Sequence, residues 1–350
     1  MAPAVAERTV SKGPDRPATS HDVAALAGVS QPTVSRALRG DSRVTAATRQ
    51  RVADAATKLG YIPSERGRSL STRKTRRVGV VVDDLSNPFY LQLLDTLHVE
   101  LALSDMQMLV FTPERSDPER VERLVDGSID GVVLTTTLIG SALPGELQRR
   151  LLPFVLLNRE IDGIAADTCV ADNFEGGRRV AAEFARLGHR RIGAILGPTD
   201  TSTGRAREAG VRAELSEHAL GLPDTRVRRG GFSFDVGYQG LLELLDEAEP
   251  PTAVFCANDV LAMGALNAAR SRGVHIPRDL TLIGFDDIGM ASWDVFRLTT
   301  VRQDMELMAR TAATLLVARI AEPSRAAERV VLPAELVLRG THGAPPPATG

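Results

Sequence analysis

Residues 20–40 read SHDVAALAGVSQPTVSRALRG, which contains two short helical patterns joined by a Gly-Val-Ser turn. In the first pattern the apolar residues Val23, Leu26 and Ala27 recur at the spacing of one helix face. Gly28 then favours the left-handed conformation that commonly ends a helix. The stretch therefore predicts two helices that meet at a tight turn, as in a helix-turn-helix.

Capping residues mark the ends of these helices and of a third one. Ser20 is placed to cap the first helix and Ser30 the second, and Pro32 falls in a first turn, where its missing N–H costs nothing. Apolar residues at helical spacing continue over 45–60 and predict a third helix. We therefore expect an all-α headpiece over residues 19–63.

The second helix is expected to make the DNA contacts of this headpiece, because its amino-terminal residues would face the major groove. Its apolar positions are Val34, Ala37 and Leu38. Among its polar residues, Arg36 suits a guanine edge and Gln31 an adenine edge. The predicted phosphate contacts are Thr33, Ser35 and Arg49, and further candidates on the same surface are Ser30, Pro32 and Arg39.

The charge of the chain is distributed unevenly. The net charge of the 350 residues is −2, but residues 1–77 hold 15 Lys/Arg and 6 Asp/Glu, a charge of +9, which leaves −11 on the rest. Such asymmetry is typical of a nucleic-acid-binding part joined to a neutral or acidic body. Residues 64–77, SERGRSLSTRKTRR, predict a basic linker, and residues 1–18 are expected to be disordered.

The composition excludes several classes of protein. The two cysteines, Cys169 and Cys256, are too few for a disulfide framework and fit a reducing cytosol. No apolar run approaches the roughly 18 residues of a membrane-spanning helix. The first residues also lack the apolar segment of a secretory signal. We therefore expect a cytoplasmic protein without a membrane partner.

From residue 78 onward, short apolar runs alternate with helical patterns. The runs are 78–82, 107–111, 131–134, 154–157, 192–196, 253–256 and 280–285, and the helical stretches are 89–103, 118–125, 174–187, 204–218, 236–246 and 259–272. This alternation predicts buried parallel sheets with helices on both faces. We expect two doubly wound α/β subdomains within 78–342, namely 78–171 with 303–323 and 172–298 with 324–342, and a disordered tail over 343–350.

Polar and aromatic side chains follow the carboxyl ends of these runs, where open α/β sheets bind their ligands. Hydrogen-bonding groups beside aromatic faces suit a polyhydroxylated ligand. The predicted ligand contacts are Phe89, Tyr90, Asn158, Arg159, Asp172, Thr203, Arg207, Phe232, Asn258 and Asp286. Three structural alternatives stay open: Asp286 as a strand-end cap, Arg207 in a helix-surface ion pair, and Phe89 in the core.

The sequence carries no motif of catalysis or metal binding. It has no G-x-S-x-G, Walker A loop, G-x-G-x-x-G or H-E-x-x-H pattern. Its six histidines are scattered and show no ligand spacing beside the two cysteines. We therefore expect no enzymatic activity, no metal and no cofactor.

Ten short motifs are spread from Thr19 to about Gly340: DVAALAGVS, TVSRAL, TRQRV, LGYIPS, RSL, VGVVVDDLSNPFY, LGHRRIG, ANDVLAMGAL, LIGFDD and LTTVRQ. Together they resemble the lactose-repressor (LacI/GalR) family of bacterial transcription regulators. The resemblance implies a core similar to periplasmic sugar-binding proteins, and a homodimer on a pseudo-palindromic DNA operator. It also implies a small effector, a sugar or a sugar derivative, that either releases or tightens the operator.

The same resemblance assigns roles to individual residues. In the family a hinge helix forms on the operator and a leucine wedges into the minor groove; the matching residue is Leu70, and Arg68 beside it is expected to contact phosphates. Trp293 falls in a segment that the family uses at its subunit interface. The family motifs map effector contacts best onto Arg207, Asp286, Phe89, Tyr90 and Phe232.

Two rival classes share part of this pattern. A solute-binding protein of a transport system would have the core, but it would need an export signal and would lack residues 19–77. A catabolic enzyme would need a cluster of nucleophile and base that the sequence does not offer. DNA binding by residues 1–77 separates both rivals from a regulator.

Overall fold

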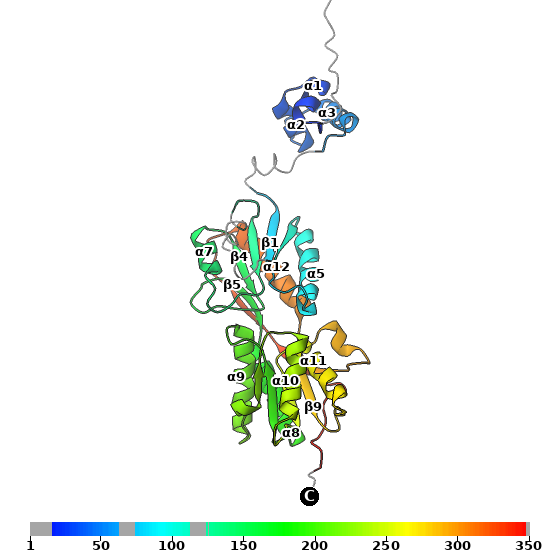
Figure 1. The fold of residues 1–350 in the computed structure, drawn as a ribbon. Coiled ribbons are helices and arrows are strands. Elements are labelled where there is room, and N and C mark those ends of the chain that lie inside the picture. Colours follow the sequence, from blue (N-terminus) through cyan, green and yellow to red (C-terminus); the bar gives the residue numbers. More distant parts are fainter. Residues whose placement is uncertain (1–15, 63–73, 113–123, 125, 348–350) are drawn as a thin grey trace, which may run out of the picture. The chain divides into compact units, whose positions relative to one another are not determined.

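The computed structural model describes residues 16–62, 74–112, 124 and 126–347. They fall into two compact units, Met1–Thr75 and Arg76–Gly350, which are drawn in Figure 1. The predicted hinge contacts Arg68 and Leu70 lie outside the described residues, as does nearly all of the predicted helix over 118–125.

The first unit contains the three predicted helices, α1 (Ser20–Ala27), α2 (Gln31–Leu38) and α3 (Ala46–Leu59). Val23, Val34 and Val52, one from each helix, are fully buried in a common core. Gly28, with φ of +65°, ends α1 in the left-handed conformation. The fold of the headpiece is therefore the helix-turn-helix that its sequence predicts.

The cap of α1 differs from the prediction by one residue. Thr19, not Ser20, is the N-cap, and the Asp22 carboxylate accepts hydrogen bonds from the Thr19 backbone N–H (2.9 Å) and hydroxyl (2.8 Å). These two bonds satisfy the Thr19 N–H and hold the start of α1.

The second unit contains two six-stranded sheets among the described residues. In the first sheet the strand order is β11 (Arg329–Leu332), β5 (Asp167–Ala171), β4 (Phe154–Leu157), β3 (Gly131–Leu134), β1 (Arg77–Val81) and β2 (Gln107–Phe111). All of its strands are parallel. Helices α5 (Pro88–Leu103) and α12 (Met305–Ala321) pack on one face, and α7 (Leu143–Arg149) packs on the other.

The second sheet has the strand order β12 (Ala334–Val337), β10 (Thr299–Gln303), β9 (Thr281–Asp286), β8 (Ala253–Cys256), β6 (Ile192–Leu196) and β7 (Val227–Arg229). Its long helices are α8 (Asn173–Leu187), α9 (Ser202–Glu217), α10 (Phe234–Leu245) and α11 (Asp259–Ser271). Two 3-10 turns, η1 (Asp224–Arg226) and η2 (Gly289–Ser292), complete it. Both subdomains are thus doubly wound α/β layers, as predicted.

The chain crosses between the subdomains three times, and the third crossing corrects a predicted boundary. Residues 324–342 were assigned to the second subdomain, but β11 pairs with β5 of the first sheet, and only β12 joins the second sheet. The single residue Pro333 separates the two strands. Because the chain keeps its direction across this point, β12 runs antiparallel to β10, so the second sheet is parallel except at this edge.

Candidate nucleic-acid interface and ligand pocket

Helix α2 divides cleanly into a buried and an exposed side. Val34 and Ala37 are buried at 0% and 8% exposure. The exposed residues of the predicted DNA contact set in this unit are Ser30, Pro32, Arg36, Arg39 and Arg49, whereas Gln31, Thr33 and Ser35 are half-buried. The predicted contacts on α2 therefore have access to a partner at the surface of the headpiece.

Several of the polar side chains near α2 are already held within the headpiece. Gln31 Nε2 donates to Ser20 Oγ at 3.3 Å, and the hydroxyls of Ser30 and Thr33 lie 2.8 Å apart. Arg36, by contrast, makes no salt bridge with any residue that the structure describes. An exposed guanidinium on a braced helix is suited to bidentate recognition of a base edge.

A pocket lies between the carboxyl ends of the two sheets in the second unit. Nine of the ten predicted ligand contacts line it, together with Asn87: Phe89, Tyr90, Asn158, Arg159, Thr203, Arg207, Phe232, Asn258 and Asp286. They follow strands β1, β4, β6, β7 and β8, or, for Asp286, end strand β9. Its cavity volume is about 20 Å³, room for about one water molecule. A cavity of this volume is too small to hold a sugar-sized ligand.

A buried ion pair forms one wall of this pocket. Arg207 Nη2 lies 3.1 Å from Asp286 Oδ1, and the two side chains are 3% and 6% exposed. Arg207 also donates from Nε to Asn173 Oδ1 (2.8 Å) and from Nη1 to the Ala257 carbonyl (2.6 Å). Its guanidinium carbon lies 3.7 Å from the centroid of the Phe285 ring. The alternative of a helix-surface ion pair for Arg207 is thus wrong.

The second partner of this pair is held in an unusual backbone conformation. Asp286 has φ of +117° and Asp287 has φ of +56°, values that cost of order 1–3 kcal/mol for a non-glycine residue. Gln303 Nε2 donates to Asp286 Oδ1 at 2.7 Å and helps to fix the side chain. Burial raises the pKa of Asp286 to about 6, although Arg207 and Gln303 act to lower it.

Behind Asp286 lies another buried carboxylate that does not line the pocket. Asp259, fully buried, accepts hydrogen bonds from the Ile288 backbone N–H (2.9 Å) and the Thr300 hydroxyl (2.5 Å). Burial, reinforced by the charge of Asp286, raises the pKa of Asp259 well above its usual range. Its neighbourhood therefore favours the neutral acid.

The lining of the pocket differs from the prediction at two residues, Asp172 and Asn87. Asp172 does not line the pocket; its carboxylate caps α8 by accepting from the Glu175 N–H at 3.0 Å. Asn87, which was not predicted, does line it, and its side chain caps α5 through the Phe89 N–H at 3.1 Å. Asn87 stands in the NPFY motif, which could have pointed to it. Phe89 both lines the pocket and packs in the core, so both of its predicted roles apply.

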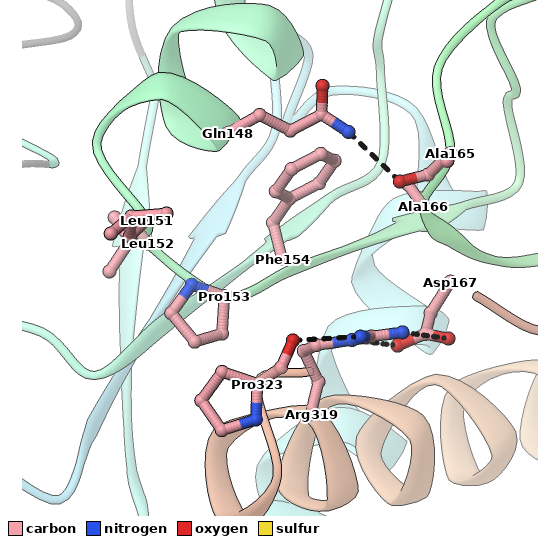
Figure 2. Close-up of a pocket in the computed structure, with 10 residues that line it drawn as sticks. All are labelled: Gln148, Leu151, Leu152, Pro153, Phe154, Ala165, Ala166, Asp167, Arg319 and Pro323. Carbon is pink, nitrogen blue, oxygen red and sulfur yellow. Dashed lines mark hydrogen bonds and ion pairs between the residues drawn. The ribbon is translucent and has the colours of Figure 1, made fainter. Parts of the chain in front are cut away.

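A larger pocket of about 210 Å³ lies at the opposite, amino end of the first sheet (Figure 2). Its charged groups are paired: Arg319 Nε lies 2.8 Å from Asp167 Oδ2, and Asp167 is fully buried. Gln148 Nε2 donates to the Ala165 carbonyl at 2.9 Å. Since these polar groups already have partners, this pocket offers a ligand little beyond apolar walls.

Cys169 and Cys256 are both buried, and neither is in a disulfide bond. In the described part of the chain no helix has the length and hydropathy to cross a membrane. Within the same residues no group of three or more His, Cys, Asp or Glu is placed to hold a metal ion.

Segments of both units match known protein families. Residues 19–64 match the model of bacterial regulatory proteins of the lacI family, and residues 181–342 match the periplasmic binding protein-like domain. The chain is 32% identical to the HTH-type transcriptional repressor CytR of Escherichia coli K12 over 96% of this chain and 99% of that protein. It is 35% identical to the regulator CelR of Thermobifida fusca, over 91% of this chain and 96% of that protein.

Solved structures agree with these sequence matches. The lac repressor dimer bound to operator and an anti-inducer superposes with a TM-score of 0.84 at 27% identity, covering 94% of this chain and all of that one. A complex of CelR with cellobiose gives a TM-score of 0.71 at 33% identity, covering 93% of this chain and 99% of that one.

Proposed function

Since this chain belongs to the lacI family of bacterial regulatory proteins, we propose that it is a transcriptional repressor whose operator affinity is controlled by a small effector. The headpiece binds the operator, and the pocket between the two subdomains binds the effector. Its curated relatives are named as regulators, so we propose regulation and not catalysis, in the cytoplasm, where the DNA is.

The arrangement of buried and exposed residues on α2 is the main support for this proposal. A buried apolar side fixes this helix to α1 and α3, and Arg36 is exposed and without a salt bridge among the described residues. Bidentate contacts of this kind discriminate between base pairs by about 1–3 kcal/mol each. Phosphate contacts from Thr33, Ser35 and Arg49 would set the register of the helix.

The pocket supports the proposal that a small effector binds between the two subdomains. Related structures contain cellobiose in CelR and ribose in a regulator from Enterococcus faecium. Residues from both subdomains line the pocket of this chain, so a ligand that binds one separation of the subdomains better than another shifts their equilibrium. We propose that this shift reaches the operator through the first subdomain and the predicted hinge, where Leu70 is the wedge.

Exposed apolar side chains support the proposal of a homodimer. Leu91, Val99 and Leu103 on α5 are 51%, 51% and 79% exposed, and Trp293 after η2 is 56% exposed. Three of these residues lie on the same helix, and exposed apolar patches commonly mark a protein interface. Two copies related by a two-fold axis would place one α2 in each half of a pseudo-palindromic operator.

Arg36→Ala is expected to relax sequence preference. Loss of the Arg36 guanidinium should reduce the discrimination between operator and random duplex by about 1–3 kcal/mol, because a guanidinium that reads a base contributes to specific binding only. The Kd of the full chain is measured on a duplex selected from a random pool and on a random duplex. Arg49→Ala, a predicted phosphate contact, is the matched control and should weaken both duplexes alike. Equal losses on the two duplexes in Arg36→Ala would refute base reading.

A further inference from the structure

Two hydrogen bonds join the subdomains beside the ligand pocket. The Ile139 N–H, in the loop after β3, donates to the Asp200 carbonyl at 2.9 Å. The Glu160 N–H, in the loop after β4, donates to Ser202 Oγ at 3.0 Å. Ile139 and Glu160 belong to the first subdomain, and Asp200 and Ser202 belong to the second. Both bonds therefore connect one subdomain to the other.

The partners in these bonds are next to residues that line the pocket. Glu160 follows Arg159 in the chain, and Ser202 precedes Thr203 at the start of α9. Arg159 and Thr203 are buried, whereas Glu160 and Ser202 are half-buried. The bonds therefore lie at the rim of the pocket.

The Glu160 backbone is fixed to the first subdomain through its own side chain. The carboxylate accepts two hydrogen bonds from Arg329 on β11, one from Nε at 2.8 Å and one from Nη2 at 3.1 Å. β11 pairs with β5 in the first sheet. A bidentate pair adds geometric specificity to its energy. The Glu160 N–H is therefore expected to move with the first sheet.

The loop that supplies the two acceptors is fixed to the second subdomain. Thr201, which is 1% exposed, donates from its hydroxyl to the Pro198 carbonyl at 2.9 Å and accepts from the Gly204 N–H at 3.3 Å. The bond with Gly204 caps α9, so Asp200 and Ser202, on either side of Thr201, are held to that helix. Each bond at the rim therefore joins two braced elements.

Hydrogen bonds define the spacing of the subdomains more sharply than the apolar contacts between them. Met263 of α11 packs in the hydrophobic cluster of the first subdomain, a contact that is non-directional. An N–H···O bond, in contrast, needs a donor–acceptor distance of about 2.7–3.2 Å. The pocket volume of about 20 Å³ means that a ligand larger than a water molecule has to widen it. Moving the subdomains apart at the rim by about 1 Å would break both bonds.

We propose that Ser202 is a positioning residue, whose hydroxyl forms with the Asp200 carbonyl a catch that holds the two subdomains at their close spacing and so limits access to the pocket. The inference rests on the proposed function, since access to the pocket is access for the effector. When the catch opens, the N–H groups of Ile139 and Glu160 bond to water instead. The net contribution of one such bond shifts the equilibrium toward the close spacing by about two- to tenfold.

Hydrogen–deuterium exchange of the full chain, resolved to single backbone amides, tests the catch. Ser202→Ala removes one acceptor, and the amides of Glu160 and Ile139 should both exchange about two- to tenfold faster. The Ile139 amide is the decisive one, because its own acceptor, the Asp200 carbonyl, is unchanged by the substitution. It exchanges faster only if the two bonds open together as the subdomains separate.

Two further variants serve as controls. Ser202→Thr keeps the hydroxyl and should exchange at the wild-type rate. Ser216→Ala, at an exposed serine near the other end of α9, is the matched control and should alter the exchange of neither amide. The amides of β3 and β6 report the stability of the two sheets and should keep their rates in every variant.

An unchanged rate at Ile139 in Ser202→Ala would overturn the inference, as would equal acceleration in Ser202→Thr, in Ser216→Ala or throughout β3 and β6. Duplex binding is measured on the same preparations. Because the exchange experiment uses neither DNA nor ligand, failure of the catch leaves the proposed function standing. Absent duplex binding, by contrast, would refute the proposed function whatever the exchange rates are.

Discussion

Asp286→Ala is expected to lower the free energy of unfolding of the α/β core by about 3–5 kcal/mol, because it leaves a buried charge without its partner. Arg207 is 3% exposed, and among the described residues its ion pair is with Asp286. The substitution also removes the acceptor of Gln303 Nε2. Chemical denaturation of the full chain, followed in the second unit, measures the change. The same variant should lose its response to effector while the headpiece still binds DNA.

A double-mutant cycle separates the ion pair from other effects of this substitution. Asp286→Asn tolerates the positive φ and keeps the side-chain shape, so it reports the loss of charge with less backbone strain. Arg207→Met removes the stranded cation, and the combination with Asp286→Ala is expected to recover 1 kcal/mol or more relative to additivity, about the size of coupling between contacting residues. Strictly additive losses would show that the pair does not stabilise the core.

Gly177→Ala is expected to destabilise the core by about 1–3 kcal/mol through overpacking. A methyl group at Gly177 on α8 would overlap the backbone carbonyl of Arg207 on α9, and one at Gly210 would overlap the carbonyl of Phe174. The two glycines therefore let α8 and α9 pack backbone against backbone. Because the overlapping carbonyl belongs to Arg207, the shift should also weaken effector binding, which titration measures.

Gly145→Ala provides the matched control for this helix-packing prediction. Gly145 lies in α7, and a methyl group there would meet nothing within 4 Å. The substitution should stabilise the chain by about 0.4–1 kcal/mol, because alanine loses less backbone entropy than glycine on folding. If Gly177→Ala behaved like Gly145→Ala, the close approach of α8 and α9 would be contradicted.

The headpiece and both sheets could be predicted because their signals are local. The apolar spacing within 20–40, with Gly28 at the end of α1 and Ser30 as the N-cap of α2, defines these two helices, and uninterrupted apolar runs define the central strands. The edge strands carry no such signal. Arg329–Leu332 and Ala334–Val337 are four residues each, and only the packing of two separate sheets determines that Pro333 divides them.

Most of the residues that line the pocket could be predicted from one rule, that ligands bind at the carboxyl ends of parallel strands. The rule does not say which of two adjacent polar residues points inward. Asp172 and Asn173 both follow β5, yet Asp172 caps α8 while Asn173 supports Arg207. Likewise, the sequence names Arg159 as a candidate, but its hydrogen bonds to the Thr136 carbonyl and the Tyr90 hydroxyl become visible only in the structure.

The central claim is that a ligand in the pocket changes the affinity of the headpiece for DNA. The most direct measurement is the Kd of the full chain for its selected duplex, with and without a saturating concentration of a small molecule that calorimetric titration shows to bind the chain. The account predicts a change of about 5- to 150-fold, the usual range for allosteric coupling, and none in Asp286→Ala. An unchanged Kd in the wild-type chain, with the pocket shown to be occupied, would contradict it.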